Sequence, residues 1–168
     1  HESACIKFAE ININSRIADY LKSKGSPVLV GTYAGWVRFL FTINNAHRCS
    51  INLRYSHGYG GSSPVTRGIA HTSREMAYLP DADILVGGHL HESYHVTLPR
   101  ERLLDSGRIV ISETECLRIP GYKDEQVGYG WAVEKGLGPK PKGAWWIRLY
   151  VDGTRKKRGI KFEVIRAK

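Results

Sequence analysis

The segment that most constrains the fold is "DILVGG", residues 83–88, which leads directly into His89, Leu90 and His91. A short, continuous apolar run is typical of a strand buried inside a parallel or mixed sheet. Open α/β sheets place their ligand sites at the carboxyl ends of such strands. The two glycines allow the backbone to turn sharply and to approach a bound group. We therefore predict that His89 and His91 lie at a ligand site.

A second predicted strand also ends in a histidine. The run "INLRYS", residues 51–56, is followed by His57 and then by a glycine-rich loop. A lone histidine at a strand end is more often a hydrogen-bonded loop residue than a ligand, but two such ends can converge on one site. The acidic neighbours Asp81 and Asp83 are expected to flank the buried strand and not to bind metal.

The remaining patterns predict a mixed α/β chain with more strand than helix, in which one sheet packs on another and helices lie outside. Helical spacing of apolar residues predicts a helix within residues 9–27 and a second one at about 65–79. Residues 28–32 and 36–43 read as a hairpin, and further strands are expected at 47–58, 83–88, 94–98, 108–115, 144–151 and 161–165.

The composition bounds the class of protein. With 168 residues, 42% hydrophobic and 24% charged, the chain reads as one globular domain, residues 1–168, with a substantial core. It shows no apolar run of membrane-spanning length and no signal peptide, so we expect no membrane partner. Its three cysteines form no CxxC pair, as is usual for reduced thiols. The expected location is the cytoplasm.

The formal net charge of +9 suits a polyanionic partner such as nucleic acid. Much of this excess lies near the end of the chain, where Arg155, Lys156, Lys157 and Arg158 follow a predicted turn. A solvated hairpin tip accounts for these residues as well as a binding patch does. The charge therefore favours a nucleic-acid or nucleotide partner only mildly.

Together, "YSHGYGG" and "DADILVGGHLH" resemble the calcineurin-like metallophosphoesterases, which carry a histidine after one strand and G-H-x-H after a later one. His1-Glu2 resembles the end of that family's G-N-H-[DE] motif. The chain contains no D-x-H, Gly-Asp or Gly-Asn. The resemblance runs from His1 to about Thr97. It implies a four-layer α/β/β/α sandwich, of which this chain would be the C-terminal half, cut within the motif.

The resemblance also implies the roles of individual residues in a centre of two divalent metal ions, Mn, Zn or Fe. His57 and His89 would ligate one metal, and His91 would ligate the other. His1 would be the catalytic histidine that binds no metal and stabilises the transition state or protonates the leaving oxygen. The bridging aspartate and the remaining ligands would precede His1.

Phosphoester hydrolysis explains why such residues gather at one site. Two metal ions roughly 3.5–4 Å apart screen the anionic ester, lower the pKa of bound water and align the attacking and leaving oxygens. Imidazole nitrogens are suitable ligands for these metals. In the loop after His57, Tyr59 and Arg67 are candidate substrate-binding residues, because an arginine there could meet a phosphate.

Two functions remain open from the sequence. The first is a metal-dependent phosphoesterase whose substrate could be a nucleic acid, a nucleotide or a phosphoprotein. The second is a basic nucleic-acid-binding or structural module without turnover, because the upstream metal ligands are absent from this chain. The sequence leaves open the metal identity and the oligomeric state.

Overall fold

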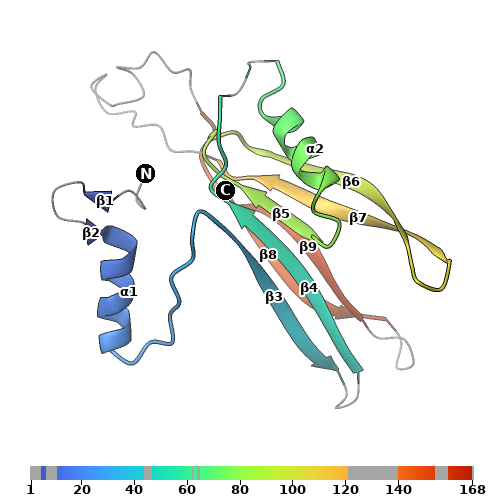
Figure 1. Ribbon diagram of the computed structural model, residues 1–168, viewed down its shortest axis with the longest axis horizontal. Helices are drawn as coiled ribbons and strands as arrows, with labels where there is room; N and C mark the ends of the chain where they lie inside the picture. The colour runs from blue at the N-terminus through green and yellow to red at the C-terminus, as the bar shows by residue number, and fades with distance from the viewer. Residues whose placement is uncertain are drawn as a thin grey trace. The chain divides into compact units, whose positions relative to one another are not determined.

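A computed structural model describes residues 5–6, 11–43, 47–61, 63, 65–120, 140–153 and 159–167 (Figure 1). The chain divides into two compact units, His1–Gly35 and Trp36–Lys168. His1 and the basic run Arg155–Arg158 lie outside the described residues. The predictions made for these positions therefore concern parts of the chain whose structure is not described.

The first unit contains the predicted N-terminal helix. Strands β1 (Cys5–Ile6) and β2 (Ile11–Asn12) pair antiparallel, and α1 spans Ile13–Ser23. The helix begins where the Asn12 side chain accepts a hydrogen bond from the Ser15 backbone N–H at 3.2 Å, an N-cap of the usual kind. The hairpin predicted from residues 28–32 is wrong, because this segment forms no strand. Its apolar side chains alone do not supply a pairing partner.

The second unit is built around a five-stranded mixed sheet with the strand order β3-β4-β5-β7-β6. The two central pairings, β4 with β5 and β5 with β7, are parallel, whereas β6 pairs antiparallel with β7. The elements of this unit are β3 (Ala34–Ile43), β4 (His47–Ser56), α2 (Ile69–Ala77), β5 (Ile84–Gly87), β6 (Tyr94–Leu103), β7 (Ile109–Arg118), β8 (Ala144–Asp152) and β9 (Gly159–Ala167).

Strand β5 lies at the centre of the sheet, as its apolar run predicts. Ile84 and Leu85 are almost completely buried. The register aligns the ends of the two parallel strands that carry the histidines, because Ser56 of β4 lies beside Gly87 of β5. His57 and Gly88 therefore leave the sheet at the same level.

Different elements pack on the two faces of the sheet. On one face Ile51, Ile84 and Leu117 form a buried cluster against the antiparallel β8–β9 hairpin. On the other face α2 is tied to the sheet, because Thr72 shares a hydrogen bond of 2.7 Å with the Tyr94 hydroxyl. The fold is thus mixed α/β and rich in strand, with a hairpin and a helix on opposite sides of the main sheet.

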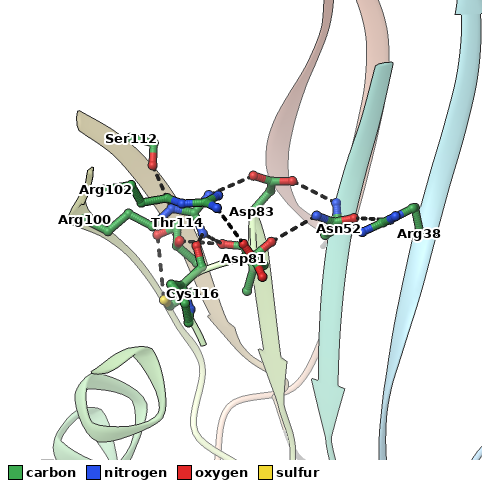
Figure 2. A network of polar contacts seen from close by, with 11 residues as sticks. Arg38, Asn52, Asp81, Asp83, Arg100, Arg102, Ser112, Thr114 and Cys116 are labelled. Carbon is green, nitrogen blue, oxygen red and sulfur yellow. Dashed lines mark hydrogen bonds and ion pairs between the residues drawn. The ribbon is translucent and has the colours of Figure 1, made fainter. Parts of the chain in front are cut away.

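The amino end of β5 is fixed by a polar network at the far end of the strand from the histidines (Figure 2). Asp83 receives a hydrogen bond from the Asn52 backbone N–H at 2.8 Å and forms an ion pair of 2.9 Å with Arg100. Arg100 also donates to the backbone carbonyls of Pro80 and Ala82. Asp83 therefore has a structural role, as the sequence predicts.

Replacing Arg100 with methionine is expected to lower the free energy of unfolding by about 2–3 kcal/mol, because it removes the charged partner of the half-buried Asp83 carboxylate and the donor to the Pro80 carbonyl. Arg102→Met is the matched control. Arg102 lies on the same face of the same strand, but its 3.1 Å ion pair with Asp81 is exposed to solvent. Its loss is expected to cost under about 1 kcal/mol. Urea unfolding of both variants measures the difference, and equal losses would contradict this role for Arg100.

Candidate metal and phosphate site

The structure brings His57 and His89 together. They follow the carboxyl ends of the adjacent parallel strands β4 and β5. The His57 Nε2 and His89 Nδ1 atoms are 3.2 Å apart, and the ring centroids are 5.1 Å apart with the planes inclined at 61°. The contact joins residues separated by 32 positions, so the sheet and not local sequence creates it.

The separation of these nitrogens fits shared ligation of one ion. Two nitrogens, each 2.0–2.1 Å from a tetrahedral metal, lie roughly 3.3–3.4 Å apart. A hydrogen bond between a protonated and an unprotonated ring nitrogen fits the same distance. The distance between the two nitrogens is therefore compatible with a hydrogen bond and with shared ligation of one ion.

The backbone at this site adopts an unusual conformation. Among the described residues, the non-glycine residues with positive φ are Arg67 (45°), His89 (68°) and His91 (54°). Histidine adopts this left-handed region more often than most residues, but still uncommonly. Such conformations cost free energy and cluster at functional sites. All three are candidate site residues from the sequence, and two of them come from the G-G-H-x-H segment.

The loops after β4 and β5 approach each other at glycines. Gly58 has a φ of +85°, and a Cβ atom there would lie 2.9 Å from the Gly88 carbonyl oxygen and 3.3 Å from the His89 Cβ. A Cβ atom on Gly88 would in turn lie 3.1 Å from the His57 carbonyl oxygen. The absence of side chains at these glycines lets the two histidine-bearing segments come into contact.

A buried cation lies beneath the two loops. Arg118, at the end of β7, is only 2% exposed. Its Nη1 donates to the Gly88 carbonyl at 3.0 Å, and its Nη2 donates to the Thr72 hydroxyl at 3.0 Å. Its Nε donates to the Tyr94 hydroxyl at 3.3 Å. These three acceptors are uncharged. The buried Glu75 carboxylate of α2 lies in the same region, since Glu75 and Arg118 both act on the pKa of the Cys116 thiol.

The packing around Arg118 explains why glycine occupies the end of β5. A Cβ atom on Gly87 would lie 2.4 Å from the Arg118 Nη1 atom, which its hydrogen bonds hold in place. The sequence analysis did not single out Arg118. Arg118 lies three residues beyond the strand predicted at 108–115, so the strand pattern gave no signal for it. Its partners come from three separate segments, so local pattern does not reveal them.

The other candidate residues lie around this pair in different ways. His91 follows the buried Leu90, and the next residue, Glu92, is buried and forms an ion pair of 2.5 Å with Lys140. Within the described part of the chain, no group of three or more His, Cys, Asp or Glu side chains is arranged to hold a metal. The structure thus joins His57 to His89, and it does not add His91 to a common group of three.

Tyr59 and Arg67 are exposed in the segment between β4 and α2. The Tyr59 ring packs edge-on against His71 of α2, with the centroids 5.4 Å apart. His71 is therefore a helix residue behind the loop, and its buried Nδ1 atom has no hydrogen-bond partner among the described residues. The Tyr59 side chain is 56% exposed to solvent.

Cys116 lies next to the site on β7 but is not a candidate nucleophile. Burial, followed by the nearby Glu115 and Glu75 carboxylates, raises the pKa of its thiol to about 12. Because the thiolate is the reactive form, this cysteine stays protonated and inert at neutral pH. It belongs to the packing beneath α2.

Comparison with protein-family models, with curated proteins and with solved structures finds no match to this chain. None of the helices in the described ranges has the length and apolar character needed to cross a bilayer.

Proposed function

We propose that the protein is a metal-dependent phosphoesterase whose metal site includes His57 and His89. The observation that carries this proposal is the 3.2 Å approach of their ring nitrogens at the carboxyl ends of two adjacent parallel strands. The positive φ angles of His89 and His91 support it, because strained backbone at a strand end needs a reason in packing or function. The calcineurin-like four-layer sandwich is part of this proposal.

Each residue near the pair has a task in this chemistry. His57 and His89 would hold a divalent ion, which when bound supplies the charge that neutralises a phosphate and activates water. Arg118 orients the Gly88 carbonyl. Arg67, at the rim, is able to donate two hydrogen bonds to phosphate oxygens. Under the same proposal, His91 completes the metal centre and His1 protonates the leaving oxygen.

The first test measures metal binding and hydrolysis of bis(p-nitrophenyl) phosphate by this protein. We expect Mn²⁺ or Zn²⁺ to bind, EDTA to abolish hydrolysis, and added metal to restore it. Loss of metal should not unfold the sheet, because its core lies away from the histidines. Absence of both metal binding and hydrolysis would favour the binding or structural module instead.

A further inference from the structure

A row of aromatic and basic side chains runs from the β3 edge of the main sheet to the loop that follows His57. We call it the aromatic strip, and it consists of Trp36, Arg38, Arg54, Tyr59 and Tyr78. Its rings are largely open to solvent: Trp36 is 49% exposed, Tyr59 is 56% exposed and Tyr78 is 62% exposed. Exposed aromatic rings that gather on one surface are typical of a binding site for a ligand or partner.

The contacts within the aromatic strip are continuous. The Arg54 guanidinium lies over the Trp36 ring, 5.8 Å from its centroid. Tyr78, at the end of α2, lies close to both Tyr59 and Arg54, and partial burial together with the neighbouring Tyr59 raises the pKa of the Tyr78 hydroxyl. Tyr59 is two residues after His57. The aromatic strip therefore extends from β3 to the loop that follows His57.

The face of β3 on which the strip begins is uncovered. Phe41 packs toward the β8–β9 side, whereas Trp36 and Arg38 are exposed. Helix α2 does not overlie β3 (Figure 1). Trp36, Arg38 and Asn52 line a hollow of about 240 Å³ together with Val37 and Asp81.

The charge of this surface suits a polyanion. Arg38 is exposed and donates to the Asn52 side chain at 2.8 Å, which holds its guanidinium over β4. Asp81, the acidic residue at the hollow, is already paired with Arg102. The formal charge of the whole chain is +9. Exposed rings separated by arginines can stack on successive bases while the arginines meet the phosphates.

We propose that the aromatic strip binds single-stranded nucleic acid and leads its backbone to the His57–His89 site. This inference rests on the proposed phosphoesterase function and narrows its substrate to a polynucleotide strand. Single-stranded DNA and RNA share the stacking and phosphate chemistry, and separate oligonucleotides distinguish them. A duplex keeps its base faces stacked inside, so it should bind this surface less tightly than a single strand.

The test measures fluorescence anisotropy of labelled 12-nucleotide DNA and RNA strands with the full chain in EDTA, so that binding is read without turnover. We expect Trp36→Ala to weaken binding by about tenfold, the loss typical of one stacked base. Arg38→Gln should reduce the slope of log affinity against log salt by about one. The matched control is Trp146→Ala, because Trp146 is an exposed tryptophan of β8 outside the strip. The affinity of Trp146→Ala for the oligonucleotides should stay within twofold of the wild-type affinity.

Several results would overturn the inference. These are tighter binding of a duplex, equal weakening by Trp36→Ala and Trp146→Ala, or no salt-dependent binding at all.

The surface would instead belong to an interface with a second copy if the protein self-associates, Trp36→Ala abolishes this self-association, and no nucleic acid binds. If Trp36→Ala does not fold, Tyr78→Ser tests the same surface. Hydrolysis of the small ester by the unaltered protein and by Trp146→Ala reports on the proposed function separately, because this ester has no bases to stack on the strip.

Discussion

Replacing His89 with glycine is expected to lower metal-dependent phosphoester hydrolysis at least ~100-fold while leaving the stability of the fold almost unchanged. Glycine removes the imidazole, so the ion loses one ligand. It also removes the conformational strain of the backbone, because the φ of 68° at this position is unfavourable for residues with a Cβ atom. The relief offsets the greater chain entropy of glycine in the unfolded state, so the free energy of unfolding should stay within about 1 kcal/mol of wild type.

His89→Ala separates the two effects. Alanine also removes the ligand, so hydrolysis should fall as far as in the glycine variant. It keeps the strained φ, so it should be less stable than the glycine variant by about 1 kcal/mol. Arg148→Gln, a change in an exposed ion pair of β8, controls for nonspecific loss of activity. If both His89 variants hydrolyse the ester normally, the histidine pair is only a hydrogen bond between loops.

The second large effect is expected from Gly58→Ala, which should cost about 2–4 kcal/mol of stability and weaken metal binding. The added methyl group meets the Gly88 carbonyl oxygen at 2.9 Å, and backbone on both sides has little room to move. The positive φ of +85° adds its own penalty. Pushing the loops apart separates the ring nitrogens of His57 and His89, so metal affinity falls together with stability.

Gly60→Ala is the matched control for this substitution. Gly60 lies in the same loop with a similar φ of +76°, but an added Cβ atom there would meet only the His71 ring at an ordinary 3.5 Å. Its cost should therefore be the backbone penalty alone, about 1–2 kcal/mol, with metal binding retained. Thermal unfolding and metal titration of the two variants measure the difference. Equal effects would show that the approach of the two loops is unimportant.

The parts of this fold that could be predicted from the sequence are those with a local physical signal. The short apolar run before Gly87 marks a strand buried on both faces, and the structure places it at the centre of the sheet. The glycines after β4 and β5 mark loops with close backbone approach. The convergence of His57 and His89 follows once the two strands are parallel neighbours.

The parts that could not be predicted depend on distant partners. Arg118 reads as a polar residue beyond a predicted strand, and only the assembled sheet shows its contacts with Thr72 and Tyr94. The segment 28–32 has the β-branched composition of a strand, but no neighbouring strand pairs with it. Positive φ at His89 and His91 also has no sequence signal, because glycine is the residue that normally marks such positions.

The shortness of β5 has a consequence for how mutations in this protein should be interpreted. The strand has four residues and spans only about 13 Å at the usual rise. Asp83 anchors one end through Arg100, and His89 follows the other. A strand this short has little length over which to absorb a shift, so displacement of its amino end is carried to the histidines. A search for inactive variants would therefore also recover substitutions at Arg100, which loosen a remote support without removing any chemical group from the site.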